Sequence, residues 1–240
     1  MKNSVVLVTG GAGAIGVNLV NKLLDENVSK IVVVDNFSSG NINFLPKSEK
    51  VEVCSIDIFR FDELRTVCKE YESDFVIHLA AHFANQNSVD HPFSDIQTNV
   101  IGTMNLLELS RESKNLKKFV YASSSCVYGD SEIMREDDFI YPYETPYAIN
   151  KYSAEMYVKY YAHNFKLPSI SVRIFNTYGP YEVAGKYRNV IPKFIENAML
   201  GKDIVITGDR NETRDFTYSS DTVELLLKAA ISDVNNGDYF

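Results

Sequence analysis

The stretch Val5-Val-Leu-Val-Thr-Gly-Gly-Ala-Gly-Ala-Ile-Gly16 decides the fold of this chain. A short β-branched apolar run leads into three spaced glycines, and a helical pattern of apolar residues follows. Gly10 lets the chain turn sharply off a strand, Gly13 lets backbone N–H groups approach a pyrophosphate, and Gly16 allows a helix to pack closely on a sheet. The start of that helix offers N–H donors and a positive dipole end to phosphates. The stretch therefore predicts a dinucleotide-binding turn between a strand and a helix.

An acidic residue follows at the distance that a dinucleotide site requires. Asp35 ends the apolar run Ile31–Val34, about 20 residues past the glycines. A carboxylate there accepts hydrogen bonds from the adenosine ribose and repels a 2′-phosphate, and no arginine occurs in Asn36–Gly40. We therefore expect NAD and not NADP. Asp57, after a third apolar run, either contacts the adenine amine or caps a helix, and the sequence leaves both open.

Apolar runs alternate with helical stretches along most of the chain, which predicts an α/β fold with a doubly wound parallel sheet, the Rossmann fold. After about Asn176 the segments become shorter and richer in loops. We divide the chain into a dinucleotide-binding domain over residues 1–175 and a small lobe over residues 176–240 that does not fold on its own. Gly237–Phe240 reads like the start of another strand, so we expect the lobe to be incomplete. The remaining runs are Val51–Cys54, Phe75–Ile77, Phe119–Ala122 and Ile170–Ile174.

The composition narrows the classes of function. The chain has 240 residues, 45% hydrophobic and 23% charged, which is typical of a soluble globular protein. A net charge of -8 argues against nucleic acid and anionic lipid, although a local basic pocket for a phosphorylated ligand is compatible with it. No apolar run reaches the roughly 20 residues of a membrane span, and no signal peptide precedes the first strand. Cys54, Cys68 and Cys126 lack metal-ligand spacing. We expect a cytoplasmic protein without a metal.

Tyr147 and Lys151 form a candidate catalytic pair. They lie four residues apart in a helical stretch and so share one face. A nearby ammonium and the positive nicotinamide of NAD would lower the tyrosine pKa from about 10 towards neutrality, which makes a general base for an alcohol. Alone, this spacing is more typical of a solvated helix face. Ser123–Ser125 follow the run Phe119–Ala122, so one hydroxyl can reach the cleft at the carboxyl edge of the sheet where Tyr147 and Lys151 would act. Alternatively, the serines only form hydrogen bonds with the backbone of their own turn.

In this order, the motifs resemble those of the extended short-chain dehydrogenase/reductases, especially the nucleotide-sugar epimerases and dehydratases. The resemblance covers nearly the whole chain. It is carried by Thr9–Gly16, Val34–Asn36, His78–Ala81, Asn99–Thr103, Ser123–Gly129, Tyr147–Lys151, Arg173–Pro180 and Thr213–Phe216.

The resemblance implies a role for each matching residue. Tyr147 would be the acid/base on the sugar O4, Lys151 would bind the nicotinamide ribose, and Ser124 matches the catalytic Ser/Thr. Asn99 would support the active-site backbone. The cofactor is expected against Gly10, Gly13, Ala14, Ile15, Gly16, Asp35, Asn36, Ser39, Gly40, Asp57, Ile58, Leu79, Ala80, Ala81, Asn99, Tyr147 and Lys151. The nucleotide sugar is expected against His82, Phe83, Ser124, Asn176, Val190 and Arg214.

Two departures from the family pattern are informative. The 4,6-dehydratases carry Asp-Glu directly after the catalytic Ser/Thr, and the UDP-glucuronate decarboxylases usually have Glu at the second position. Here these residues are Ser125 and Cys126. Without a second acid, the hydride that leaves the sugar C4 returns to the other face of the 4-keto sugar. We therefore predict a 4-epimerase. Tyr178–Phe194 resembles the matching segment of UDP-sugar 4-epimerases, so we expect the substrate to be a UDP-sugar. The alternatives are a 4,6-dehydratase or another 4-keto-forming member such as a decarboxylase, and a catalytically silent NAD-binding protein.

Four further interpretations concern single residues and the assembly of the chain. Cys126 matches a catalytic cysteine of GDP-sugar relatives, but the second residue of their acid/base pairs is missing, so we interpret it as a small cleft-lining residue. His82 and Phe83 either contact the sugar or pack the loop, and His78 is interpreted as structural. The long helical stretches Phe93–Ser113 and Pro146–Phe165 resemble the pair that forms a four-helix interface in relatives, which predicts a homodimer.

Overall fold

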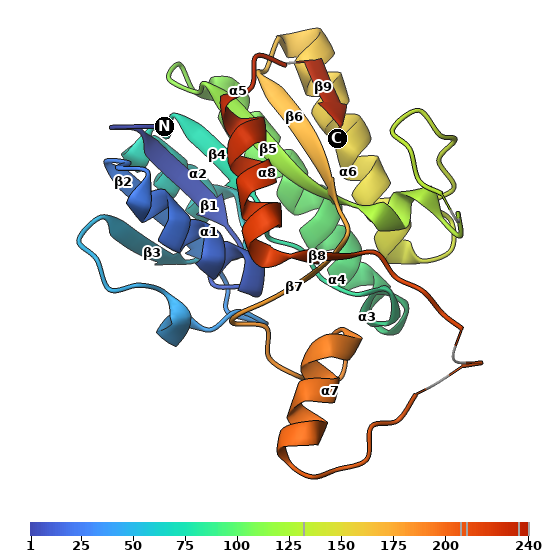
Figure 1. Ribbon diagram of the computed structural model, residues 1–240. Coiled ribbons are helices and arrows are strands. Elements are labelled where there is room, and N and C mark those ends of the chain that lie inside the picture. Colours follow the sequence, from blue (N-terminus) through green and yellow to red (C-terminus); the bar gives the residue numbers. More distant parts are fainter. Residues whose placement is uncertain (132, 207, 210, 235, 240) are drawn as a thin grey trace.

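The structure, a computed structural model, describes residues 1–131, 133–206, 208–209, 211–234 and 236–239. Within these residues the centre is a seven-stranded parallel sheet in the order β3-β2-β1-β4-β5-β6-β9 (Figure 1). The strand order reverses between β1 and β4, which creates a crevice at the carboxyl ends of these strands. The strands are β1 (Val5–Thr9), β2 (Lys30–Asp35), β3 (Val51–Ser55), β4 (Phe75–His78), β5 (Lys118–Ser124), β6 (Ser169–Ile174) and β9 (Asn236–Tyr239).

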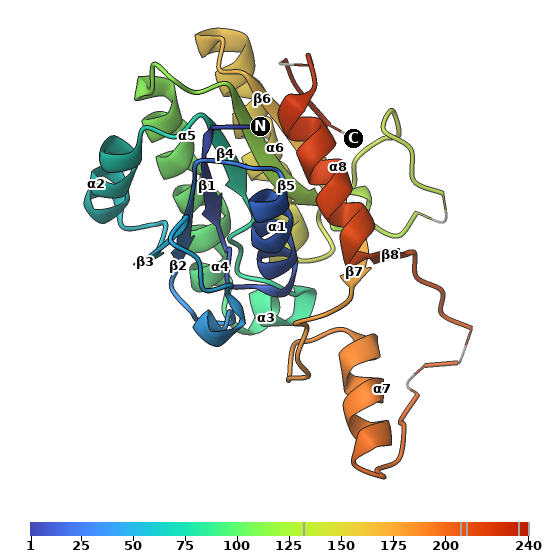
Figure 2. The ribbon, with the colours of Figure 1, turned by 60° about the vertical axis from the view of Figure 1, so that its left-hand side comes forward.

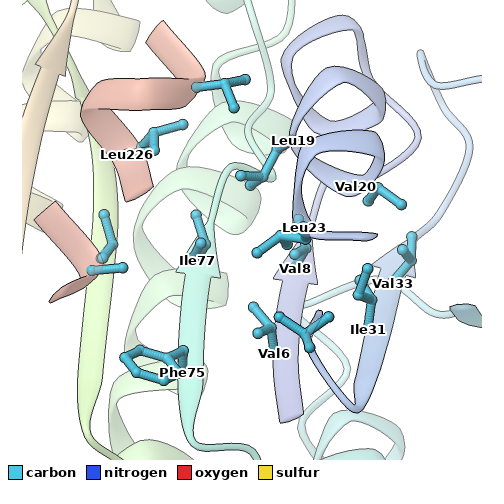
Figure 3. Close-up of a cluster of buried hydrophobic side chains, with 14 of the residues drawn as sticks. Val6, Val8, Leu19, Val20, Leu23, Ile31, Val33, Phe75, Ile77 and Leu226 are labelled. Atoms are coloured by element: carbon cyan, nitrogen blue, oxygen red, sulfur yellow. The ribbon is translucent and has the colours of Figure 1, made fainter. Parts of the chain in front are cut away.

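Helices cover both faces of the sheet, as the predicted doubly wound fold requires. One face carries α1 (Ala14–Asp25) and α8 (Ser219–Ile231), and the other carries α2 (Phe61–Tyr71), α5 (Thr103–Glu112) and α6 (Pro146–Phe165) (Figure 2). Side chains alternate along each strand, so Val6 and Val8 face α1 while Leu7 faces the opposite core. Figure 3 shows Leu19 and Leu23 of α1 over these valines. Continuous apolar strands are therefore buried on both sides.

The predicted helix Phe93–Ser113 is interrupted. The structure has α4 (Pro92–Ile96), a π-helical segment η2 (Gln97–Gly102) and then α5. A Cβ at Gly102 would lie 2.5 Å from Ile58 Cδ1, so this segment packs closely on the loop after β3. π-helical segments often occur at functional sites. The short helical elements are η1 (Ile42–Phe44), α3 (Asn85–Asp90) and η3 (Ser125–Tyr128).

The part of the chain after β6 alternates between the sheet and a separate layer. Strands β7 (Asn176–Tyr178) and β8 (Phe216–Tyr218) form a small parallel pair, and α7 (Val190–Met199) projects from the body in both views (Figures 1 and 2). α8 and β9 return to the central sheet, with β9 beside β6. The domain boundary at residue 176 stays a prediction, and Phe240 lies outside the described residues. Among the described helices, none is long and apolar enough to cross a membrane.

Candidate active site

A pocket of about 530 Å³ lies at the carboxyl ends of the central strands. Its walls come from the glycine turn before α1, the loops after β2, β3 and β4, the end of β5, and the start of α6. Residues 174–180 and the segment that leads to α7 close the opposite side. The volume is typical of a small-molecule or cofactor site, and its position is the switch point where open α/β sheets bind ligands.

The glycine turn has the geometry that a pyrophosphate requires. Gly10 has a φ of +69°, and a Cβ there would lie 2.6 Å from Ala80 N. A Cβ at Gly16 would lie 2.3 Å from Gly10 O, so a side chain would force the helix away from the strand. Gly13 caps α1 with no side-chain hydrogen bond. The first N–H groups of α1 therefore meet the pocket with no side chain in front of them, which fits a dinucleotide phosphate.

Asp35 organises the adenosine end of the pocket. Its carboxylate accepts hydrogen bonds from Ala12 N at 2.9 Å and Phe37 N at 2.8 Å. Burial raises the pKa of this carboxyl above its usual value, an effect that the two backbone donors oppose. Asn36 donates to Asp57 at 2.6 Å. Asp57 also accepts from Phe59 N at 3.3 Å, so this carboxylate lines the pocket and holds the turn before α2 at once.

The predicted triad meets at the other end of the pocket. β5 ends at Ser124, whose Oγ accepts from Cys126 N at 3.2 Å. Tyr147 lies in the first turn of α6, close enough to Ser124 for the serine hydroxyl to lower its pKa as a hydrogen-bond donor. Lys151 follows one turn later, with its Nζ 5.9 Å from the centre of the Tyr147 ring and donating to Ala122 O at 2.8 Å. The structure therefore brings the three side chains together, and it places Cys126 in the lining of the same pocket.

The local start of α6 explains where Tyr147 stands. Thr145 is the N-cap and accepts from Ala148 N at 3.2 Å, and Pro146 fits the first turn because it lacks an N–H. Tyr147 N donates to Ser88 Oγ on α3 at 3.0 Å. Ser88 is fully buried, so this tie from α3 fixes the tyrosine backbone at the pocket wall.

Burial controls the protonation of both catalytic candidates. It raises the pKa of Tyr147, and the hydrogen bond from Ser124 lowers it only in part. The sequence predicts a lowered tyrosine pKa beside Lys151 and NAD. In the protein without cofactor the pKa is raised instead, because the Tyr147 side chain is only 6% exposed and its desolvation outweighs the other effects. Burial also lowers the pKa of Lys151 to about 8. Lys151 is therefore mainly charged at pH 7.

A buried polar cluster supports the wall behind the triad. Asn99, in the π-helical segment, accepts from His82 N at 3.0 Å and donates to His82 O at 3.1 Å. It also donates to Asp95 at 2.9 Å, and Asp95 accepts from Asn150 of α6 at 2.6 Å. Asp95 is fully buried, and its charge helps keep Lys151 protonated. Sequence reasoning missed Asp95, because its role depends on helix packing.

His78 occupies a structural position. Its Nδ1 lies 2.7 Å from Thr9 Oγ1 and its Nε2 lies 2.9 Å from Thr103 Oγ1, which itself donates to Asn99 O. Nε2 therefore carries the proton in the neutral ring. Burial lowers the pKa of His78 to about 3, so the ring is uncharged at neutral pH. It joins β1 and β4 to the π-helical segment.

Most of the predicted residues lie in one pocket, with three exceptions. Asn99 and His82 form its support, and Val190, at the start of α7, lies outside the lining. Asn176 donates to Asp215 O at 3.1 Å, which fixes β7 beside β8. The predicted residues in the lining are Gly10, Gly13, Ala14, Ile15, Gly16, Asp35, Asn36, Ser39, Gly40, Asp57, Ile58, Leu79, Ala80, Ala81, Phe83, Ser124, Tyr147, Lys151, Asn176 and Arg214.

The pocket also contains charged residues that we did not predict. Glu182, Lys186, Arg188 and Lys193 line its outer side. Burial raises the pKa of Glu182, while the charge of Arg188 lowers it. The cations Lys186, Arg188 and Lys193 lie close together in the sequence of an acidic chain, which could have indicated an anion site. Nothing in the pattern of this segment relates it to the glycine turn.

Comparison with known proteins agrees with this site. The model of the "NAD dependent epimerase/dehydratase family" matches residues 6–239. The chain therefore belongs to this family, and NAD is its cofactor. It is 36% identical to the putative UDP-glucose 4-epimerase of Methanocaldococcus jannaschii over 227 residues, which covers 93% of this chain and 72% of that protein.

Two solved structures extend the likeness to three dimensions. An epimerase from Methanothermobacter thermautotrophicus superimposes with a TM-score of 0.94 at 40% identity, over all of this chain and 71% of that one. The UDP-N-acetylglucosamine 4-epimerase of Methanobrevibacter ruminantium, solved with UDP-N-acetylmuramic acid, gives a TM-score of 0.91 at 34% identity, over 98% of this chain and 75% of that one.

Proposed function

We propose that this protein epimerises a nucleotide sugar at C4 through a transient 4-keto intermediate, and that its substrate is a UDP-sugar. The observation that supports this most is the meeting of Ser124, Tyr147 and Lys151 at one end of the dinucleotide pocket. Relatives are named as a putative UDP-glucose 4-epimerase and a UDP-N-acetylglucosamine 4-epimerase. Their names support both the proposed reaction and the proposed nucleotide.

Each member of the triad has a separate task in this proposal. Tyr147 takes the proton from the sugar O4 and later returns it, while Ser124 holds the same oxygen by a hydrogen bond. When bound, NAD would supply the acceptor for the C4 hydride and the source of its return. Lys151 holds the nicotinamide ribose, and its positive charge favours the tyrosinate that burial alone disfavours. Expulsion of water from the pocket strengthens these charge effects.

The pocket composition favours epimerisation over dehydration. A 4,6-dehydratase needs an acid beside the catalytic serine to move water off C6, and here Ser125 and Cys126 occupy those positions. The carboxylates in the described lining are Asp35, Asp57 and Glu182. The first two lie at the adenosine end, and the third lies beside Arg188. The ketone therefore has one simple outcome, which is return of the hydride to its other face.

Product analysis tests the reaction directly. Incubation with UDP-glucose, UDP-N-acetylglucosamine, UDP-glucuronate and dTDP-glucose should give a C4 epimer of one UDP-sugar. An accumulating 4-keto-6-deoxy sugar would instead establish the dehydratase alternative.

A variant pair tests the assigned base and the catalytically silent alternative. Tyr147→Phe should reduce kcat by about 10²–10⁴-fold, the usual contribution of an acid/base group. Tyr71→Phe, at the end of α2 and remote from the site, should leave the rate unchanged. Equal activity of Tyr147→Phe and wild type would show that this mechanism is wrong, and no turnover of any nucleotide sugar would favour a silent NAD-binding protein.

A further inference from the structure

Residues 180–188 cross the pocket and touch the cofactor half of the molecule at several points. We call them the crossing segment. Asn18 of α1 donates to Pro180 O at 3.1 Å, and the ring of Tyr181 lies 5.5 Å from that of Phe44. At its other end, Arg188 Nη2 donates to Ser39 O at 3.0 Å. The segment is thus attached beside the glycine turn and along the loop that follows Asp35.

A second set of contacts attaches the crossing segment to the opposite wall. Lys186 Nζ and Tyr187 OH both donate to Asp90 of α3, at 3.1 and 2.8 Å. Together with a hydrogen bond from Gln86, which has the largest effect, they lower the pKa of Asp90 to about 2, so this carboxylate stays charged at neutral pH. The segment therefore reaches from the adenosine side of the pocket to the helix that supports Tyr147.

Arg188 is the cation of the crossing segment that is hydrogen-bonded to the loop after Asp35. It lines the same pocket as Gly13, Ala14 and Ser39, and its guanidinium lies 6.0 Å from the ring centre of Phe83 on the loop after β4. Arg188 therefore lies between Ser39 and Phe83 in the lining of the pocket. The Ser39 carbonyl uses one of its five N–H donors. Its charge acts on Glu182 of the same segment, but among the described residues no carboxylate forms an ion pair with it.

We propose that Arg188 binds the pyrophosphate of the resident NAD and so fastens the crossing segment over the cofactor. The start of α1 offers N–H donors to the phosphates from one side, and the guanidinium offers charge-assisted, paired donors from the other. In a chain with a net charge of -8, a local cation at this point offsets the repulsion of the dianionic pyrophosphate. α7 begins two residues after Arg188, so the contact also ties the substrate lobe to cofactor retention.

Equilibrium binding to the full chain, freed of NAD, tests this role without any turnover. NAD affinity is measured by calorimetry in the absence of sugar nucleotide, for wild type, Arg188→Ala and Arg188→Lys. Lys228→Ala is the charge-matched control, because Lys228 lies on α8 outside the pocket lining and pairs there with Glu224 at 2.7 Å. We expect at least a tenfold loss of NAD affinity in Arg188→Ala, a smaller loss in Arg188→Lys, and less than a twofold change in Lys228→Ala.

Salt and a second ligand sharpen the result. Raising the NaCl concentration should weaken NAD binding more in wild type than in Arg188→Ala. Salt screens the attraction between the guanidinium and the pyrophosphate, and the variant lacks that attraction. Wild-type NAD affinity in Arg188→Ala would overturn the proposal. So would unchanged NAD affinity with weakened binding of UDP alone, which would assign the guanidinium to the substrate diphosphate. Because the readout is cofactor affinity, failure of the proposed epimerase activity would be seen separately.

Discussion

Gly13 and Gly16 allow a test that separates cofactor binding from folding. They lie three residues apart in one turn, but their surroundings differ. A Cβ at Gly16 would lie 2.3 Å from Gly10 O and 2.6 Å from Gly11 Cα, where backbone atoms have no room to move independently. A Cβ at Gly13 would meet only Gly10 O, at 3.3 Å. Gly13 has a φ of -75°, which alanine adopts without strain.

The same substitution should therefore have two different effects. Gly16→Ala should lower the free energy of unfolding by roughly 1–3 kcal/mol or more, as overpacking does, which at about 2–4 °C per kcal/mol lowers Tm by about 2–12 °C. Gly13→Ala should change that free energy by less than about 1 kcal/mol. It should weaken NAD binding by about 100-fold, because the methyl group stands where the pyrophosphate approaches the N–H groups.

Thermal unfolding of the NAD-free proteins gives the stability, since bound NAD would itself raise Tm. Calorimetric titration with NAD gives the affinity, and each variant is the control for the other. Wild-type NAD affinity in Gly13→Ala would refute the assignment of the turn to the pyrophosphate. A Gly16→Ala protein as stable as wild type would refute the role given to close helix–strand packing.

Three further predictions concern protonation and assembly. Because burial lowers the pKa of Lys151 to about 8, the ammonium is lost as the pH rises through 8, and initial rates should fall above that pH; a rate that stays flat to pH 10 would contradict this. The pKa of His78 is lowered to about 3, so the unfolded chain binds more protons between its usual value near 6.5 and pH 3. The free energy of unfolding, measured with urea, should then decrease as the pH falls through this range, by at most about 1.4 kcal/mol per pH unit. If a His78→Gln protein had the same acid sensitivity, His78 would be excluded as the cause. Met156 on α6 is 47% exposed, and Met156→Glu should convert the predicted homodimer to a monomer in light scattering after gel filtration. The control is Ile231→Glu on α8, at a residue that is 63% exposed, and it should leave the dimer intact. A wild-type monomer would disprove the predicted dimer.

Local patterns were sufficient to predict the sheet and to relate the glycine turn to Asp35, which line one pocket in the structure. The valines around Leu7 form a strand because each is buried on one face or the other, and Gly10 and Gly16 are required by contacts within the turn itself. Asp35 could be assigned because its hydrogen-bond partners lie in the turn and in its own loop. Such features depend on residues close in sequence, or on the regular pairing of strands.

The features that sequence reasoning missed depend on distant contacts. The helix predicted over Phe93–Ser113 contains a π-helical segment, which periodicity cannot show. The bond between Arg188 and Ser39 joins residues 149 positions apart, and Asp95 gains its role from Asn150, 55 positions away. The predicted direction of the Tyr147 pKa was also incomplete, because spacing on a helix does not reveal how completely a phenol is buried.

Hydride return to the carbon that lost it is the most direct test of the proposed reaction. UDP-glucose, UDP-N-acetylglucosamine and UDP-glucuronate, each carrying deuterium at C4, would be incubated with the holoenzyme, and the products would be examined by NMR and mass spectrometry. We expect one of them to give its C4 epimer with deuterium retained at C4 and no solvent hydrogen gained there. Loss of the C4 label to solvent, or its appearance at C6 of a 4-keto sugar, would contradict 4-epimerisation by this protein.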